Sequence, residues 1–434
     1  MRLNHSDLDD SLDFIAHASS DHSRYNAIFA APLAPTKVSA PASTTVTKTT
    51  ATSAYSVSAD VLSHETGGVL AYAGALAVLD DAAAQTMSAS LFSQLTAAAT
   101  SLNAAGGVKT SAYVQQLFDD VVLGNAANKS WNGGANTAVA LGNLSATSSK
   151  TQFNELIGKW FLGTDLPGVA PAPGQTSAYA ASYQTYSLPL FTSAGPKLTD
   201  VNQGQVGDCW FLSAIAETAL LDPSLIKDLI TSNGNGTYTV EFQVNGKADY
   251  VTVDSQLPTY SGNIGQWDGS KMEFANSTSS LWVELIEKAA AQLAEQGVVT
   301  GMQYGSGADQ YYELNAGAGE GVTLLTGQAC NSYWLGGQSG SSLTTLLGQM
   351  HNDLAAGYDV MLGTSGMSVG GNLVAGHMFA VTAVNAAAGT VSLYNPWGGN
   401  AVGNGKAESF TIAASALVAD QASFFAASGS ATVA

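Results

Sequence analysis

Apolar residues recur every three or four positions between Asp60 and about Asp165, which is the spacing of one face of an α-helix. The clearest segments are VLAYAGALAVLDDAAAQTM, SASLFSQLTAAATSL, SAYVQQLFDDVVLG and TQFNELIGKWFLG. Ser88 and Ser111 stand where helix N-caps are expected. The pattern predicts a small all-α domain over residues 60–165, in which no group of residues suggests chemistry.

The pattern changes beyond about Ser182, where apolar and polar residues alternate in several short runs. We expect strands over TYTVEFQVNG, ADYVTVDSQLP, HMFAVTAVN and GTVSLYNPWG. Helices are expected directly after Asp208 and over SLWVELIEKAAAQLAEQ. This mixture predicts an α+β domain with antiparallel strands over residues 182–429.

Two stretches lack such patterns and are predicted to be linkers. Residues 1–59 begin with an acidic segment and continue as a Pro/Ser/Thr/Ala-rich tract. Its few apolar residues cannot offset the entropy lost on ordering, so we expect 1–59 to be disordered. Residues 166–181 are rich in Pro and Gly and are predicted to link the helical domain to the α+β domain.

The charge balance excludes some partners. The chain has 14 Lys and Arg against 33 Asp and Glu, a net charge of −19, and no basic run. It therefore lacks the positive surface that binding a nucleic-acid backbone requires.

The sequence shows neither a membrane span nor a Sec signal peptide. No apolar run reaches the roughly 18 to 20 residues that span a bilayer, so no membrane span is expected. The first residues lack the basic and apolar regions of a Sec signal peptide. The composition fits either a cytoplasmic protein or a bacterial protein exported by another route.

Cys209 lies in the segment that carries chemistry, DVNQGQVGDCWFLSAIAETAL. It follows a Gly-containing turn and begins an apolar helix, where the positive helix end favours the nucleophilic thiolate. A buried structural cysteine is the alternative. Gln203, six residues earlier, offers an amide that could bind an oxyanion together with the Cys209 N–H. Gly207 and Asp208 are expected to shape the turn, with Asp208 capping the helix.

His377 begins one predicted strand and Asn395 follows the next, with a short turn near Ala387–Gly389 between them. Antiparallel neighbours joined in this way place the two side chains close together. The order Cys, His, Asn suits a triad in which His takes the thiol proton and Asn holds the imidazole. The six histidines show no HExxH or Cys/His ligand spacing, so nothing indicates a zinc enzyme.

QGQVGDCWFLSAIA, GHMFAVTAV and LYNPWG, in this order, closely resemble the three catalytic blocks of the calpain-type cysteine proteases, which have the papain fold. The resemblance covers about Leu188 to Phe425. It implies a two-lobed papain-like core with Cys209 as nucleophile, His377 as base, Asn395 as orienting residue and Gln203 as oxyanion donor. It also implies that Trp397 shields the contact between His and Asn.

Calcium is a further implication, because animal calpains bind it within the protease core. Asp200 matches an acidic ligand of one such site and Gly195 matches a carbonyl ligand. The second site lacks its first acid, since Ala401 stands there. The resemblance thus implies calcium at one site at most. The modules that follow the core in animal calpains have no match here, so a bacterial-type protease core alone is expected.

The expected function is hydrolysis of protein or peptide substrates through a thioester acyl-enzyme. A thiol acyltransferase and a non-catalytic secreted binding protein on a protease fold remain alternatives. The helical domain would be a propeptide, a docking module or an export module in contact with the catalytic domain. Self-processing is expected to cut the breaker-rich tracts Pro32–Ala59 or Leu166–Ala180.

Overall fold

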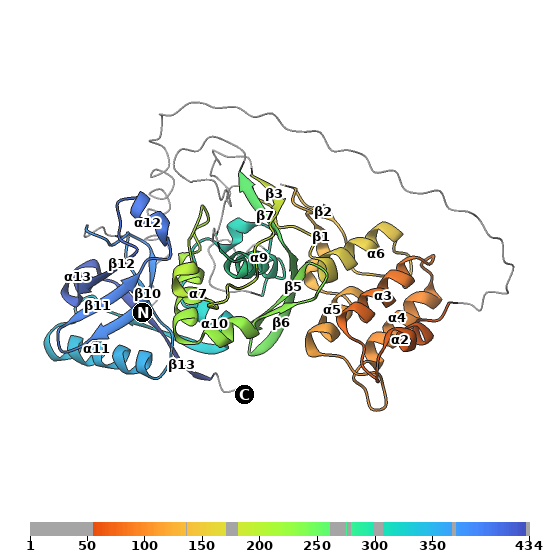
Figure 1. The fold of residues 1–434 in the computed structure, drawn as a ribbon, viewed down its shortest axis with the longest axis horizontal. Helices are drawn as coiled ribbons and strands as arrows, with labels where there is room; N and C mark the ends of the chain where they lie inside the picture. Colours follow the sequence, from red (N-terminus) through yellow and green to blue (C-terminus); the bar gives the residue numbers. More distant parts are fainter. Residues whose placement is uncertain are drawn as a thin grey trace, which may run out of the picture.

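The computed structural model describes residues 55–430, apart from 136, 171–180, 261–274, 276–278, 299–306 and 367–369. Three bodies follow one another along the chain and along the long axis of the molecule (Figure 1). We call them the helical module (residues 55–165), the helical half (181–326) and the β half (328–430). The architecture is α+β with a group of helices before it, as the pattern predicts.

The helical module contains the four predicted helical segments. Its elements are α2 (Val57–His64), α3 (Tyr72–Ala83), α4 (Ala89–Ser101), α5 (Ala112–Val122), η2 (Ala126–Lys129), β1 (Ser130–Trp131), β2 (Val139–Ala140), α6 (Lys150–Ile157) and a π-helical turn, η3 (Gly158–Leu162). Ser88 caps α4 by accepting a hydrogen bond from the Leu91 N–H, as predicted. Ser111 precedes α5 as its N-cap residue, but its side chain makes no capping bond.

Helix α2 was not expected, because it begins inside the segment predicted to be a disordered linker. Its start is fixed by Ser56, whose side chain accepts a hydrogen bond from the Ala59 N–H, and by burial of Val57 and Val61. The rest of the predicted N-terminal linker, residues 1–54, lies outside the described residues.

The helical half surrounds a three-stranded antiparallel sheet with the order β4-β5-β6. Its elements are β3 (Ala181–Thr185), η4 (Leu198–Asp200), α7 (Cys209–Leu221), α8 (Pro223–Asp228), β4 (Ile230–Ser232), β5 (Thr237–Val244), β6 (Lys247–Asp254), β7 (Gln256–Tyr260), α9 (Trp282–Ala294), η5 (Tyr311–Leu314) and α10 (Glu320–Thr326). Strands β3 and β7 form a separate antiparallel pair.

The β half is a six-stranded antiparallel sheet with the order β12-β11-β10-β9-β13-β8. Its elements are β8 (Gln328–Trp334), α11 (Gly340–Ala355), β9 (Val360–Gly363), β10 (Met378–Asn385), β11 (Thr390–Tyr394), α12 (Gly399–Gly403), β12 (Ser409–Ala413), α13 (Ala414–Asp420) and β13 (Ser423–Ser430). The predicted pairing of the strands around His377 and Asn395 is confirmed, since β10 and β11 are antiparallel neighbours.

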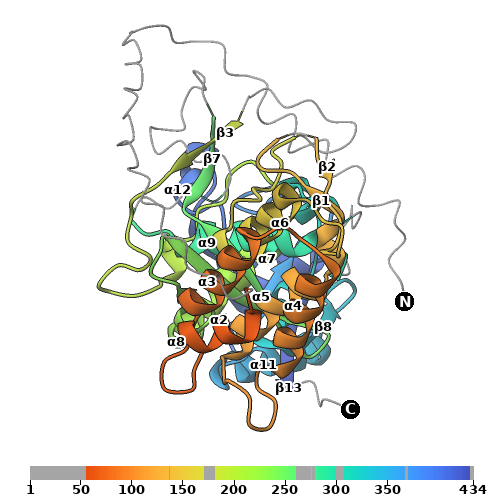
Figure 2. The ribbon, with the colours of Figure 1, turned by 90° about the vertical axis from the view of Figure 1, so that its right-hand side faces the viewer.

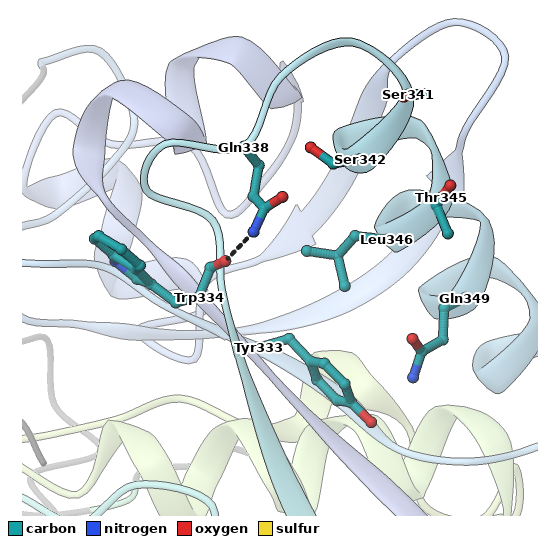
Figure 3. Close-up of a pocket in the computed structure, with 8 residues that line it drawn as sticks. All are labelled: Tyr333, Trp334, Gln338, Ser341, Ser342, Thr345, Leu346 and Gln349. Atoms are coloured by element: carbon teal, nitrogen blue, oxygen red, sulfur yellow. Dashed lines mark hydrogen bonds between the residues drawn. The ribbon is translucent and has the colours of Figure 1, made fainter. Parts of the chain in front are cut away.

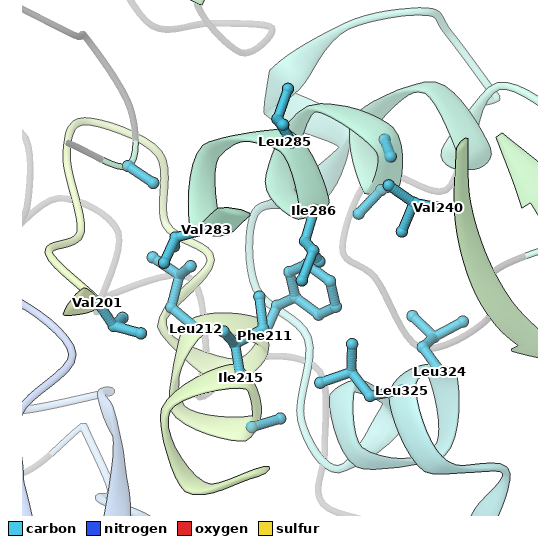
Figure 4. Packing of buried hydrophobic residues seen from close by; sticks show 14 of the residues in the cluster. Val201, Phe211, Leu212, Ile215, Val240, Val283, Leu285, Ile286, Leu324 and Leu325 are labelled. Carbon is cyan, nitrogen blue, oxygen red and sulfur yellow. The ribbon is translucent and has the colours of Figure 1, made fainter. Parts of the chain in front are cut away.

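Helix α7 lies between the two halves and is buried at every position from Trp210 to Ala219. Figure 4 shows Phe211, Leu212 and Ile215 packing against side chains of α9 and α10 in the core of the helical half. On its other side α7 packs against β10 of the β half. A helix with so few polar positions is stable only when it is enclosed in this way.

The helical module packs against β6, at the end of the molecule opposite to β10–β12 (Figures 1 and 2). The Tyr72 hydroxyl lies 3.2 Å from Thr237 Oγ1 of the neighbouring strand β5, and the Gln116 amide donates to Asp249 of β6 at 2.8 Å. Gly163 has a positive φ of 59°, and a Cβ there would lie 2.5 Å from the backbone of Val253 and Asp254. Only glycine allows this close approach.

A buried ion cluster joins the helical module to the helical half. The Lys159 ammonium lies 2.5 Å from Asp165 Oδ2 and 2.5 Å from Glu295 Oε2, and all three side chains are at most 1% exposed. Burial alone would lower the pKa of Lys159, but Asp165, Glu295 and the nearby Asp309 raise it above its ordinary value. Lys159 is thus the internal counter-ion of the cluster.

The predicted linker over residues 166–181 is integrated at its start. Leu166, Pro167 and Gly168 are buried. Gly168 exchanges backbone hydrogen bonds with the segment at Asp309 and Tyr311, at 2.8 and 3.0 Å. The structure therefore places these three residues in the core rather than in an exposed tract. Residues 171–180 lie outside the described residues.

No helix in the described part of the chain is long and apolar enough to cross a membrane.

Replacing Lys159 by Met should lower the free energy of unfolding by about 3 to 5 kcal/mol, because buried carboxylates would lose their counter-ion. Urea titration followed by circular dichroism measures this change. Lys150→Met is the matched control, since Lys150 is exposed at the start of α6 and should change stability by less than about 0.5 kcal/mol. Equal stability of Lys159→Met and Lys150→Met would contradict the role of the cluster.

Candidate active site

Cys209 is the first residue of α7 and is half-buried. Asp208 is the N-cap residue, but its side chain makes no capping bond, so the predicted capping role is wrong. The physical reason is that its carboxyl group turns inward. It accepts a hydrogen bond from the Gln203 amide at 3.1 Å and shares another with Glu287 of α9.

The pair of Asp208 and Glu287 was not found from the sequence. Burial raises the pKa of Asp208 to about 7, and burial together with Asp208 raises the pKa of Glu287 well above its ordinary value. A hydrogen bond between two carboxyl groups needs a proton on one of them, and the raised pKa values favour this protonated form. The sequence feature that could have indicated this pair is Glu287, an acidic residue within the predicted helix WVELIEKAAAQLA.

His377 lies directly before β10 and Asn395 directly after β11, and the two side chains are in contact. His377 Nε2 is 2.9 Å from Asn395 Oδ1. The Trp397 backbone N–H also donates to Asn395 Oδ1, at 3.0 Å, so this atom is the acceptor oxygen of the amide. His377 therefore carries its proton on Nε2, and Nδ1 has a free lone pair. The Trp397 ring lies 5.1 Å from the imidazole centroid.

The α7 helix brings Cys209 to the start of β10. The backbone N–H of Met378, the residue after His377, interacts with the Cys209 sulfur and favours its thiolate. Burial outweighs this contact and raises the pKa of Cys209 to about 12. Burial also lowers the pKa of His377 to about 4, against the opposing effect of Asn395. Both shifts favour the uncharged forms of the thiol and the imidazole.

Gln203 lies in the same loop as Cys209 and is buried. Its amide donates to the Val206 carbonyl at 2.8 Å and to Asp208 Oδ1 at 3.1 Å. The Oε1 atom has no hydrogen-bond partner among the described residues. Both amide protons are thus used within the loop, and an oxyanion would be reached only after rotation of this amide.

The Gln203 loop and the Asn395 loop are bound to each other, although almost 200 residues separate them. The Gln203 N–H donates to the Pro396 carbonyl at 2.8 Å, and the Gly399 N–H donates to Asn202 Oδ1 at 2.8 Å. Gly398 has a φ of 54°, and a Cβ there would lie 2.3 Å from Asn202 Oδ1. The final glycine of NPWG is required for this contact.

Gly207 lies in the turn before the cysteine. Its N–H donates to Asn315 Oδ1 at 2.6 Å, and its carbonyl accepts from the Ala316 N–H at 3.0 Å. These bonds attach the turn to the loop that follows η5. Asn315 was not found from the sequence, because a single asparagine between short elements carries no pattern.

The candidate calcium ligands Asp200 and Gly195 lie close to other donors. Asp200 Oδ2 accepts hydrogen bonds from the Lys197 N–H and from Trp282 Nε1, both at 3.0 Å. The Lys227 ammonium lies 3.2 Å from the position that a Cβ of Gly195 would take. Calcium needs six to eight oxygen ligands, and an adjacent ammonium opposes its binding. The residues as they lie do not fit a calcium site.

Acidic clusters occur elsewhere in the described part of the chain. Ligand atoms of Asp165, Glu295 and Asp309 lie within 4.8 Å of one another, close enough to hold a metal ion, but the Lys159 ammonium already lies between two of them. Asp60, His64 and Asp81 form a second group on the surface of the helical module. Neither group includes a predicted site residue.

A groove of about 430 Å³ lies between β8 and α11 and contains none of the predicted site residues (Figure 3). It is lined by uncharged side chains, among them Tyr333, Leu346 and Gln349. The lining has hydroxyl groups, among them those of Ser341 and Ser342, but no acidic or basic side chain that could activate them as nucleophiles.

Comparison with known proteins points to one family. A family model described as calpain family cysteine protease matches residues 176–408, more than half of the chain. The chain is 32% identical over 226 residues to the calpain-type cysteine protease DEK1 of Arabidopsis thaliana, which covers 50% of this chain and 10% of the relative. It is 26% identical to Calpain-8 of Mus musculus over 228 residues, 49% of this chain and 29% of the relative. The chain thus spans less than a third of these relatives.

The low pKa of His377 predicts a pH dependence of stability. Below pH 6.5 the unfolded chain binds a proton at this histidine, whereas the folded protein binds it only near pH 4. As the pH is lowered from 6.5 to about 4, the free energy of unfolding should therefore fall by about 1.4 kcal/mol per pH unit. A His377→Asn variant lacks this contribution and is the reference. Urea titrations of both proteins at several pH values measure the difference. Parallel pH profiles, or an NMR pKa above 6.5, would contradict a neutral resting imidazole.

Proposed function

The chain belongs to the calpain family of cysteine proteases, and from this premise we propose that it is an endopeptidase that cleaves protein substrates with Cys209, His377 and Asn395. The observation that carries the proposal is the hydrogen bond from His377 Nε2 to Asn395 Oδ1. This hydrogen bond leaves His377 Nδ1 free to act as the base. His377 lies at the start of β10, and β10 packs against α7, the helix that begins with Cys209. Figure 1 places this helix between the two halves, which would form the two lobes of a papain-like core.

The reaction begins when the Cys209 thiol transfers its proton to His377 Nδ1 and the sulfur attacks the substrate carbonyl carbon. The oxyanion is stabilised by the Cys209 N–H and by Gln203, after its amide leaves Asp208. Collapse of the tetrahedral intermediate breaks the C–N bond, and His377 gives its proton to the departing amine. Water then attacks the thioester while His377 takes a proton from it. The C–S bond breaks, the carboxylic acid product leaves, and the Cys209 thiolate regains the proton from His377.

The supporting residues hold this arrangement in place. Asn395 keeps the imidazole in the Nε2–H form, and the Trp397 ring lies against the imidazole and shields it from water. A buried neutral pair suits the resting enzyme, because the substrate and the oxyanion donors supply the polar surroundings that ionisation needs. Hydrolysis is favoured over acyl transfer by the amide groups of Asn395 and Gln203. A purely binding protein would have no need of all four groups.

The helical module is proposed to be a retained structural part rather than a propeptide that covers the site. It packs on β6, at the opposite end of the molecule from β10, the strand that follows His377 (Figure 1). Its ion cluster with Glu295 is buried, so detachment would expose unpaired charges. Self-processing, if it occurs, is expected in residues 32–54 or 171–180, since Leu166 to Gly168 are buried.

Replacing Cys209 by Ala should abolish both casein cleavage and covalent labelling by the epoxide inhibitor E-64. Labelling is read by intact mass, which also reveals any self-processing of the wild type. The matched control is Cys330→Ala, which removes the other thiol of the chain, from strand β8, and should keep full activity. Casein cleavage by purified Cys209→Ala protein would reject the proposed nucleophile.

Removal of calcium by EGTA should leave casein cleavage unchanged, because the donors around Asp200 and the ammonium beside Gly195 oppose an ion there. Rates are compared in EGTA and in excess calcium. Asp200→Asn should show the same insensitivity. A more than tenfold loss in EGTA that calcium restores would instead support the calcium site implied by the family resemblance.

A further inference from the structure

The hydroxyl and carboxyl groups of α7 between Trp210 and Ala219 all bind the β half. From Trp210 to Ala219 the residues with hydroxyl or carboxyl groups are Ser213, Glu217 and Thr218, and each is at most 2% exposed. Their hydrogen bonds run to residues of the β half rather than to the helical half. The side of α7 toward the helical half is held by apolar packing, and the side toward the β half is held by hydrogen bonds.

Ser213 binds the strand that follows the catalytic histidine. Its hydroxyl donates to the Met378 carbonyl at 3.0 Å, and Met378 is the residue after His377. Ser213 lies four residues after Cys209, so the two side chains share one face of the helix. Met378 therefore contacts one turn of α7 twice. The Met378 N–H lies at the Cys209 sulfur, and the Met378 carbonyl accepts from the Ser213 hydroxyl.

Glu217 makes the next contact along the same face. Its Oε2 accepts from the Val381 N–H at 3.0 Å, and its Oε1 accepts from the Val360 N–H at 2.8 Å. The β9–β10 pairing runs from Met378 with Gly363 to Ala380 with Met361, and Val381 and Val360 come next. The carboxyl group therefore binds both strands where their pairing ends.

We propose that Ser213 and Glu217 are positioning residues that fix the register of α7 against β10, and thereby the placement of Cys209 at His377. This inference rests on the proposed function of those two residues. Apolar contacts are non-directional and tolerate sliding, whereas these hydrogen bonds have defined geometry. A slip of α7 by one residue moves Cys209 by about 1.5 Å, and a misplacement of about 1 Å can cost a hundredfold in rate.

The test measures the reactivity of Cys209 directly. The full chain is prepared with Cys330→Ala, so that one thiol remains, and its alkylation by iodoacetamide is followed by intact mass from pH 5 to pH 9. In this background, Ser213→Ala should slow alkylation at neutral pH about tenfold and Glu217→Gln about a hundredfold. The kcat for casein peptides should fall in parallel, with little change in KM, because the substrate-binding groups are intact.

Thr218→Val is the matched control. Thr218 is equally buried and donates to Asp359 Oδ2 at 2.7 Å, so it also joins α7 to the β half, but it contacts the residue before β9 and not β10. This variant should lower the thermal unfolding temperature and leave the alkylation profile at the wild-type rate. Alkylation slowed equally by Thr218→Val and Ser213→Ala would show that only general stability matters and would overturn the proposal.

The outcomes separate the two levels of inference. Wild-type alkylation and kcat in folded Ser213→Ala and Glu217→Gln proteins would also overturn the positioning role. Should Glu217→Gln fail to fold, Ser213→Ala alone decides, since it removes one hydroxyl and leaves the helix packing intact. A wild type that does not cleave casein would reject the proposed function, whereas the alkylation rates would still report whether the register of α7 controls the reactivity of Cys209.

Discussion

Helix α7 is buried on every side from Trp210 to Ala219, so each of its polar groups has to find a partner inside the protein. Its apolar side packs on α9 and α10, and its hydroxyl and carboxyl groups bind the β half. The helix thus joins the two halves and carries Cys209 at its first position. Burial opposes formation of the thiolate there, so reactivity depends on the helix end, on the Met378 N–H and on His377.

Scarcity of cations imposes a second constraint. The chain has 14 Lys and Arg for 33 acidic residues, and two of the lysines, Lys159 and Lys288, are buried as counter-ions. Some other buried carboxyl groups take partners that carry no positive charge. Glu217 accepts two backbone N–H groups, and Asp208 shares a proton with Glu287. An acidic chain can bury carboxyl groups in this way because N–H donors and protons replace the missing counter-charges.

Elements with a clear apolar period could be predicted from the sequence, and so could the neighbouring positions of His377 and Asn395, because a short turn joins the two strands. Other predictions failed where a tertiary contact outweighs the local pattern. Asp208 does not cap α7, since Gln203 and Glu287 bind its carboxyl group. The breaker-rich segment at Leu166 is buried, because Gly168 pairs with the backbone near Asp309.

The sequence by itself determined the helices and strands that have a clear apolar period, and the order of Cys209, His377 and Asn395 along them. These features depend on periodicity and on spacing within a few tens of residues. The tertiary structure alone decided which partner each buried polar group takes. Ser213 and Glu217 bind strands more than 140 residues away, and Lys159 binds Glu295 across 136 residues. No local pattern encodes such pairs, because they follow from which surfaces meet once the core has packed.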